Sequence, residues 1–402
     1  MTGTAGRGMG AARVVMVTGV CAAMIIGKLP PAVPALQREL GMTLMQAGWL
    51  LSLVQVASLS MGLFLGLASD RFGLRRSMLT GLSLMSLASL VGGFTESASV
   101  LLVLRAFEGL GFLLTSLSAP AVLRRLVPPE RLTQVMGIWG AYVPFGTALA
   151  MLLGPAVILA GGWESWWWLI GLLCVLCLAA VWRWVPADPS RAIAQAGEGG
   201  LGSKLRLTLS STGPWLLFLT FCVYAAQWMA VIGFLPTIYA QAGVTGWTLG
   251  VLMALVPAMN IFGNVAAGML LHRGAQPGSL LIAGFVVMAL GSWLAFVGLE
   301  LSPAVRYGGM LLFSLVGGLV PGTLFALVPR LAPNTGLIST TVGWMLQGSS
   351  TGQFFGPLVA AWLSAQVGGW HWTWVATGAC ALAGCLLATR FGRLASGHPV
   401  RH

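Results

Sequence analysis

The chain has 402 residues, of which 57% are hydrophobic, only 7% are charged and 55 are glycines. An ordinary soluble domain carries about 25% charged residues. A soluble protein this apolar could not cover its own surface with polar groups, so the composition predicts an all-α polytopic membrane protein in a lipid bilayer. In a soluble protein, a net charge of +12 would suggest a nucleic-acid partner. Here the basic residues gather on one side of the predicted membrane spans, so no nucleic-acid partner is expected.

Apolar runs of about 20 residues, the length that crosses a bilayer as a helix, recur along the whole chain. The first run is long and leads into others, so we expect it to be an uncleaved first span. The pattern predicts twelve transmembrane helices, over residues 14–36, 46–69, 77–95, 99–122, 133–158, 166–183, 214–236, 246–271, 279–299, 305–328, 337–362 and 371–389.

The Lys and Arg residues lie very unevenly about these spans. Of the 21, Lys28 and Arg105 fall within spans and Arg38 and Arg306 on one side of the membrane, which leaves 17 on the other side. Because cytoplasmic loops carry an excess of Lys and Arg, we expect both termini in the cytoplasm. The expected location is the plasma (inner) membrane of a bacterium, crossed many times.

Three charged residues lie well inside predicted spans: Lys28 in the first, and Arg105 and Glu108 in the fourth. At a rise of about 1.5 Å per residue, all three are at similar depth. Intramembrane charge is expensive unless paired or hydrated, so such residues are candidates for function. Two cations outnumber one carboxylate, which favours an anionic substrate. Arg105 offers a planar fork for an oxyanion, and Lys28 offers a point charge.

Glu108 is the only carboxylate well inside a span, which makes it the natural carrier of a coupled proton. Burial favours the neutral form of a carboxyl group, and a nearby cation favours the ionised form, so substrate at the cation would switch its protonation. Two alternatives stay open. Glu108 forms a static ion pair with Lys28 or Arg105 that holds helices together, or Arg105 is a structural arginine that bonds backbone carbonyls.

A short polar turn between the second and third spans reads GLASDRFGLRR. Its glycines permit close helix approach and a turn that other residues resist. Its aspartate and first arginine are placed to cap and pin helix ends, and its last two arginines add charge beside the membrane surface. We expect the turn to form a cytoplasmic gate through Gly66, Asp70, Arg71, Gly73, Arg75 and Arg76.

Two further residue groups have simple interpretations. Cys174 and Cys177 form C-x-x-C on a predicted helix without nearby His or acidic ligands, so we expect buried small apolar residues and no metal or other cofactor. Tryptophans cluster near the predicted outer ends of spans and predict an interfacial aromatic belt; they are Trp163, Trp166, Trp167, Trp168, Trp370, Trp372 and Trp374.

The two halves of the chain repeat each other. The pattern Gly-x-x-x-Asp-Arg at 66–71 aligns with Gly-x-x-x-His-Arg at 268–273, and Leu29-Pro30 recurs as Leu235-Pro236. Such repeats mark a transporter built from two parallel halves. The predicted domains are an N-terminal six-helix bundle over 1–185, a cytoplasmic linker over 186–213 with a short amphipathic helix near its end, and a C-terminal six-helix bundle over 214–402. Because the seventh span corresponds to the first, Gln227 is a further candidate for substrate binding.

The turn closely resembles the signature loop between helices 2 and 3 of the major facilitator superfamily of secondary transporters. The run RAFEGLG at 105–111 is similar to the R-x-x-Q-G-x-G motif of that family, with Glu108 where glutamine is common. Span 5 resembles the glycine- and proline-rich exporter motif through Gly146, Gly154 and Pro155, although five residues instead of two separate the proline from the following Gly-Gly pair. Within that superfamily, the sequence as a whole most resembles the cyanate- and nitroimidazole-type permeases.

The resemblance implies the major facilitator fold, two pseudo-symmetric six-helix bundles whose binding site lies between the halves and is lined by spans 1 and 4. The predicted function is secondary active transport of a small-molecule substrate, an organic or inorganic anion, by alternating access with proton coupling. The protein is expected to act as a monomer. Substrate identity and the direction of transport stay open.

Two other functions are weighed against this prediction. A multidrug/proton antiporter would have a large apolar cavity with few fixed cations, so Lys28 argues against it. A membrane sensor that binds solute without transporting it usually carries an added signalling domain, for which the linker is too short. An enzyme is not expected, because the sequence shows no catalytic dyad or metal cluster.

Overall fold

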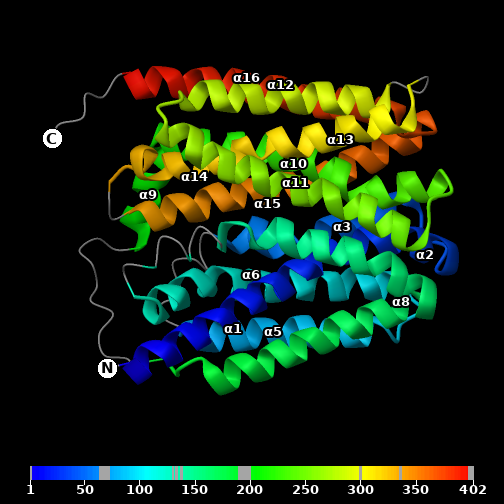
Figure 1. Ribbon diagram of the computed structural model, residues 1–402, viewed down its shortest axis with the longest axis horizontal. Coiled ribbons are helices and arrows are strands. Elements are labelled where there is room, and N and C mark those ends of the chain that lie inside the picture. The colour runs from blue at the N-terminus through cyan, green and yellow to red at the C-terminus, as the bar shows by residue number, and fades with distance from the viewer. Residues whose placement is uncertain are drawn as a thin grey trace. The chain divides into compact units, whose positions relative to one another are not determined.

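A computed structural model describes residues 2–62, 73–128, 131, 135, 139–188, 201–297, 301–334 and 337–396. Within these ranges the regular secondary structure is helical throughout (Figure 1). The expected all-α architecture is therefore confirmed for the described part of the chain.

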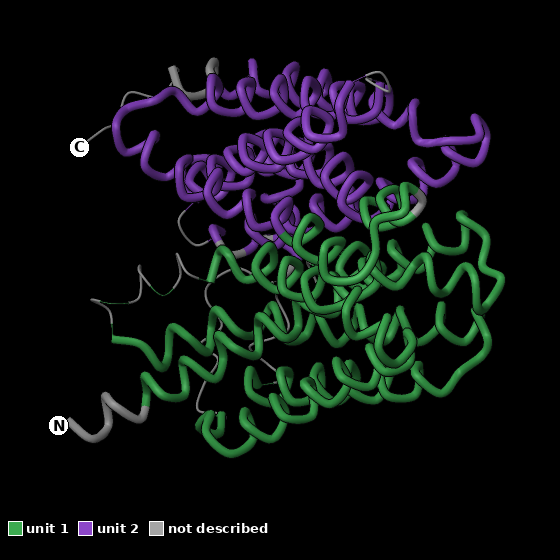
Figure 2. Tube along the Cα trace, turned by 45° about the vertical axis from the view of Figure 1, so that its right-hand side comes forward, with its two compact units in different colours: residues 1–200, 235–254 green, residues 201–234, 255–402 purple. Residues whose placement is uncertain are grey.

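The chain divides into two compact units, residues 1–200 with 235–254 and residues 201–234 with 255–402 (Figure 2). The first unit thus includes the end of α10 and the start of α11, which the predicted domains assign to the C-terminal bundle. The predicted boundaries at 185 and 213 stay a prediction.

The described helices at the start of the first unit are α1 (Thr2–Gly27), α2 (Leu29–Glu39), α3 (Leu44–Leu53), α5 (Leu74–Gly92), α6 (Ala98–Leu126) and α8 (Tyr142–Trp184). The remaining elements are α9 (Leu201–Ser210), α10 (Thr212–Gln241), α11 (Gly246–His272), α12 (Pro277–Phe296), α13 (Pro303–Gly317), α14 (Leu319–Leu331), α15 (Ile338–Val367), the 3₁₀ helix η2 (Trp370–Trp372) and α16 (Thr373–Ser396). The short helix expected near the end of the linker is α9, and residues 189–200 lie outside the described residues.

Most of these helices have the composition of membrane spans. In the described residues, eight are long and apolar enough to cross a bilayer, and a pair bent by 40°, Leu44–Leu53 with Val56–Gly62, adds one more if it is a single span. The predicted spans 133–158 and 166–183 are joined in α8, whose backbone leaves helical geometry at Gly161 and Gly162. Gly162 has a φ of 80° there, a left-handed value that glycine adopts without strain.

Two further predicted spans are interrupted inside the bilayer segment. The first breaks at Lys28, because Pro30 and Pro31 lie in the first turn of α2, directly after Leu29, and have no N–H to donate. The tenth breaks at Gly318, between α13 and α14. The first break is important because it places a charged residue at a junction between two buried helices.

Small residues bring the main helix pairs of each unit into close contact. A Cβ atom at Gly146 of α8 would lie 2.6 Å from the Val20 carbonyl oxygen of α1. In the second unit, Gly352 of α15 faces α10 so closely that a Cβ atom would lie 2.0 Å from the Cys222 carbonyl oxygen. Backbones can approach this closely only where no side chain intervenes. Gly146, which belongs to the segment that resembles an exporter motif, therefore has a packing role.

Candidate functional site

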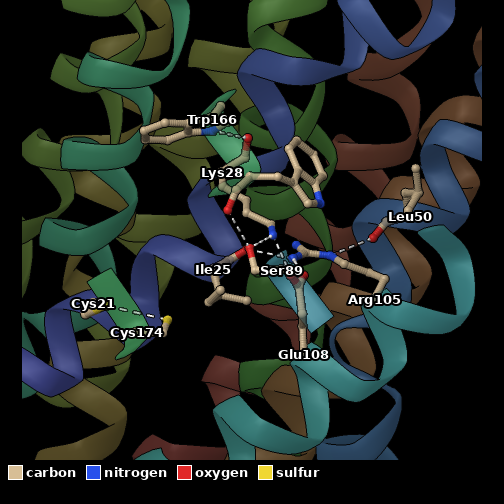
Figure 3. A network of polar contacts seen from close by, with 10 residues as sticks. Cys21, Ile25, Lys28, Leu50, Ser89, Arg105, Glu108, Trp166 and Cys174 are labelled. Carbon is tan, nitrogen blue, oxygen red and sulfur yellow. Dashed lines mark hydrogen bonds and ion pairs between the residues drawn. The ribbon is translucent and has the colours of Figure 1, made fainter. Parts of the chain in front are cut away.

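The three intramembrane charges predicted from the sequence meet in one buried cluster of the first unit (Figure 3). Lys28 lies at the junction of α1 and α2, and Arg105 and Glu108 lie three residues apart on α6. A spacing of three places two side chains on the same face of a helix. Lys28 is 0% exposed, and Arg105 and Glu108 are each 2% exposed. All three charges are therefore removed from solvent.

Glu108 is shared between the two cations. Its Oε1 atom forms an ion pair with the Lys28 ammonium group, and its Oε2 atom lies 2.8 Å from Nη1 of Arg105. One carboxylate thus satisfies two cations, and the cluster holds one excess positive charge when all three groups are ionised. Removing a charge from water is tolerable only with such partners.

Two residues complete the environment of Lys28: Ser89, which the sequence did not indicate, and Trp167, which it placed in an aromatic belt. The Lys28 ammonium group donates to Ser89 Oγ of α5 at 2.8 Å, and Ser89 donates to the Trp167 carbonyl at 3.0 Å. The ammonium nitrogen also lies 4.4 Å from the centroid of the Trp167 ring, within the range of a cation–π contact. The sequence carries no signal that separates Ser89 from the other serines of its span.

The prediction of an interfacial aromatic belt is wrong for three tryptophans. Trp163, Trp166 and Trp167 are at most 3% exposed, whereas Trp168 and Trp372 are 36% and 46% exposed. The three buried residues follow the break at Gly162, and the rings of Trp163 and Trp167 meet edge to face with their centroids 5.3 Å apart. Trp166 donates from Nε1 to the Lys28 carbonyl at 2.9 Å, so this segment supports the charge cluster.

Arg105 also bonds backbone carbonyls, which is the structural role that the sequence left open as an alternative. Its Nε donates to the Leu50 carbonyl of α3 at 3.1 Å, and its Nη1 donates to the Ile25 carbonyl of α1 at 2.7 Å. Its Nη2 atom is buried and has no hydrogen-bond partner among the described residues. Arg105 therefore joins three helices and keeps one open donor beside Glu108.

The predicted gating turn is only partly described. Gly66, Asp70 and Arg71 lie outside the described residues. Gly73 has a φ of 90° and immediately precedes α5, as its predicted turn role requires. The remaining two members, Arg75 and Arg76, lie in the first turn of α5.

Asp188 lies four residues beyond the end of α8, was not singled out from the sequence, and binds the start of α5. Its carboxylate accepts from the backbone N–H of Arg75 at 3.1 Å and of Arg76 at 3.3 Å, and forms an ion pair with Arg125 at 3.1 Å. The Arg75 guanidinium group donates to the Trp182 carbonyl. A carboxylate at a helix N-terminus satisfies free N–H groups and complements the helix dipole.

Gln227 belongs to the second unit. It lies on α10, is 1% exposed, and neither its amide oxygen nor its amide nitrogen has a hydrogen-bond partner among the described residues. The buried polar side chains of that unit are uncharged throughout the described part.

Many apolar helices that enclose a desolvated charge cluster are typical of a polytopic membrane protein. The chain belongs to the major facilitator superfamily, whose family model matches residues 15–347. It is a transporter and not an enzyme, as predicted.

Relatives are transporters and resistance proteins. The chain is 27% identical over 320 residues to the chloramphenicol resistance protein of Pseudomonas aeruginosa, which covers 74% of this chain and 75% of that protein. It is 26% identical over 324 residues to the 3-(3-hydroxy-phenyl)propionate transporter of Escherichia coli, covering 79% and 77%. Similarity of 30% to the tetracenomycin C resistance and export protein of Streptomyces glaucescens extends over 33% of this chain and only 24% of that protein.

Solved structures share the fold. A D-xylose-proton symporter superposes with a TM-score of 0.76 at 17% identity, covering 94% of this chain and 96% of that chain. A bacterial homolog of the human lysosomal transporter Spinster gives 0.74 at 15% identity, covering 98% and 96%. The predicted fold class, two six-helix bundles of the major facilitator type, is confirmed. The narrower cyanate- and nitroimidazole-type group stays a prediction.

Proposed function

We propose that the protein transports a small organic or inorganic anion by alternating access, coupled to protons. Lys28 and Arg105 bind the anion, and Glu108 carries the proton. One observation carries the proposal: a single buried carboxylate is shared by two buried cations, so the cluster has an excess positive charge to offer a substrate.

Competition for the same donors would couple the two events. Glu108 occupies the Lys28 ammonium group and Nη1 of Arg105, while Nη2 of Arg105 has no partner among the described residues. An anion at Nη2 brings negative charge beside Glu108 and favours its protonation. A neutral Glu108 attracts Lys28 and Arg105 less strongly than a carboxylate does. The two cations are then available to bind the anionic substrate. One proton is bound by Glu108 as one anion is bound by the cations.

Similarity to a transporter of an organic acid supports an anionic substrate for this protein. The Escherichia coli relative is named for an aromatic propionate and is similar over 79% of this chain. The loop residues 66–76 are proposed to hold the cytoplasmic gate, with both termini in the cytoplasm. Asp188 supports this gate by fixing the N-terminus of α5.

The test compares accumulation with exchange in proteoliposomes. In Glu108→Gln the amide mimics a permanently protonated carboxyl group, so anion binding and anion exchange should persist while proton-driven accumulation is lost. Lys28→Ala should abolish anion binding, because desolvation of the anion is no longer compensated. Glu164→Gln, a carboxylate outside the cluster, is the matched control and should accumulate normally. Accumulation by Glu108→Gln would end the proposed proton role.

Multidrug export is the second candidate function, favoured by the similarity to the chloramphenicol resistance protein over 74% of the chain. An apolar or cationic drug gains nothing from two buried cations, so export of such a drug should survive Lys28→Ala. Drug resistance in a susceptible host that persists in this variant, with no anion uptake by the wild-type protein, would favour export over the anion proposal.

A further inference from the structure

Two of the partners of Lys28 do not change their charge when Glu108 binds a proton. An ammonium group has three N–H donors. In Lys28 the Glu108 carboxylate and the Ser89 hydroxyl accept from it, and the Trp167 ring, whose centroid lies 4.4 Å away, gives it a third contact. The carboxylate becomes neutral on proton uptake, whereas the hydroxyl and the ring are neutral throughout. Ser89 and Trp167 are therefore the partners that Lys28 keeps when Glu108 is protonated.

The hydroxyl group of Ser89 is oriented to bind a cation (Figure 3). Ser89 lies on α5, is fully buried, and donates its proton to the Trp167 carbonyl at 3.0 Å. A hydroxyl group has a single proton, so the lone pairs of this oxygen face the Lys28 ammonium group, 2.8 Å away. Ser89 could donate to an anion only by giving up the Trp167 carbonyl. Its position therefore suits the cation and not the substrate.

The ring of Trp167 is packed between neighbours of the same unit. The Trp163 ring meets it edge to face, and Gly92 of α5 lies so close that a Cβ atom there would be 2.7 Å from Trp167 Cδ1. A larger residue at position 92 would thus push the ring away. This packing holds the ring in place when the charges beside it change, so its face stays available to the ammonium group.

Protonation of Glu108 leaves Lys28 in surroundings that oppose its charge. The titratable and charged groups within electrostatic reach of the ammonium group are Glu108 and Arg105 of α6 and the Cys174 thiol of α8. Arg105 does not lose its proton, so it stays a cation at every stage. A buried ammonium group beside a second cation releases its proton unless other groups favour its charged form. A neutral Lys28 would have no charge to offer an anion.

We propose that Ser89 and Trp167 are positioning residues that keep Lys28 protonated and in place while Glu108 carries the proton. Both favour the charged form of Lys28, because the hydroxyl oxygen accepts a hydrogen bond from it and the face of the indole ring attracts a cation. The positive charge offered to the anion then persists through the whole cycle. This inference rests on the proposed function, in which Lys28 binds the anion and Glu108 binds the proton.

The pH dependence of anion binding in Glu108→Gln tests the inference, because the amide stands in for the neutral carboxyl group. Calorimetry with 3-phenylpropionate on the purified full-length protein gives the pH midpoint at which binding is lost as Lys28 releases its proton. Adding Ser89→Ala should lower this midpoint by about one pH unit, because the charged form loses a hydrogen bond. Adding Trp167→Leu should lower it by a similar amount. Ser89→Thr and Trp167→Phe, which keep a hydroxyl group and a ring, should shift it less.

Control variants separate a positioning role from packing. Trp163→Phe should lower the melting temperature and leave the pH midpoint unchanged; an equal shift of the midpoint would reduce Ser89 and Trp167 to packing and overturn the inference. Cys174→Ser should also keep the midpoint, and its disappearance there would assign it to the thiol instead of Lys28. If Trp167→Leu does not fold, Ser89→Ala against Ser89→Thr decides alone.

Two further outcomes distinguish the inference from the proposed function. A midpoint that stays in place in Ser89→Ala and in folded Trp167→Leu overturns the inference, while the proposed function stands because the anion still binds. Failure of the wild-type protein to bind the anion at any pH overturns the proposed function, and the inference falls with it.

Discussion

In the first unit the buried polar centre is ionic, and its charges satisfy one another: Glu108 pairs with both Lys28 and Arg105. In the second unit the buried polar side chains of the described residues are neutral, and Gln227 has no partner among them. Leaving an ion unpaired in a low-dielectric interior costs far more than leaving an amide unpaired. A charged binding group must therefore have an internal partner that the ligand displaces, whereas a neutral group can stay open until a ligand arrives.

The largest loss of stability is expected from removing Glu108, the carboxylate that both cations share. Glu108→Gln leaves two buried cations without their shared carboxylate and should lower the free energy of unfolding by about 3–5 kcal/mol. Lys28→Met leaves the Arg105–Glu108 pair intact and should cost less. Chemical denaturation in detergent measures the free energy of unfolding of each variant and so ranks them. Adding an anionic ligand should restore stability to Glu108→Gln. A larger loss for Lys28→Met would contradict the shared-carboxylate account.

In the second unit, the largest loss of stability should come from Asn260. Asn260→Leu removes the donor to the Tyr224 hydroxyl and one of two donors to the Ser314 carbonyl, which keeps its bond from the Gly318 N–H. The Tyr224 hydroxyl loses this partner, at a cost of about 1–3 kcal/mol. The measurement is again unfolding in detergent, with Tyr224→Phe as a partial control that removes one of the two bonds. A neutral result would show that this network is already hydrated.

A smaller and more local effect is expected at Asp188. Asp188→Ala removes the acceptor for the first N–H groups of α5 and should cost about 1 kcal/mol. Amide hydrogen exchange should increase at Arg75 and Arg76, while exchange around Lys28 stays unchanged. Arg125→Ala, which removes an ion pair whose arginine is 46% exposed, should have less effect. Unchanged exchange at Arg75 would remove Asp188 from the proposed gate.

The smallest effect on stability is expected at Gln227. Gln227→Leu exchanges an unpaired buried amide for an apolar side chain and should leave the melting temperature unchanged or slightly raised. Thermal unfolding without ligand is the measurement, with Asn260→Leu alongside, and a drop equal to that of Asn260→Leu would show that both units satisfy their polar groups internally.

The helices and the charged centre could be predicted from the sequence because their signals are local. Apolar runs define spans, and a fixed rise per residue puts Lys28, Arg105 and Glu108 at one depth. Partners set by tertiary structure could not be predicted. Ser89 looks like any small residue of its span, the direction of Trp167 depends on the break at Gly162, and Asp188 contacts a helix more than a hundred residues earlier in the chain.

The proposed function requires the cluster of Lys28, Arg105 and Glu108 to bind the substrate and the coupled proton, and not only to hold helices together. The double variant Lys28→Met with Glu108→Gln is the sharpest test, because both members of one ion pair become neutral. Arg105, bonded to the Leu50 and Ile25 carbonyls, then stays as a single buried cation, so part of the stability lost in Glu108→Gln should return. Proton-driven accumulation of the anion in proteoliposomes should then be absent from a well-folded protein. A double variant that accumulates the anion as the wild-type protein does, still driven by protons, would contradict the claim.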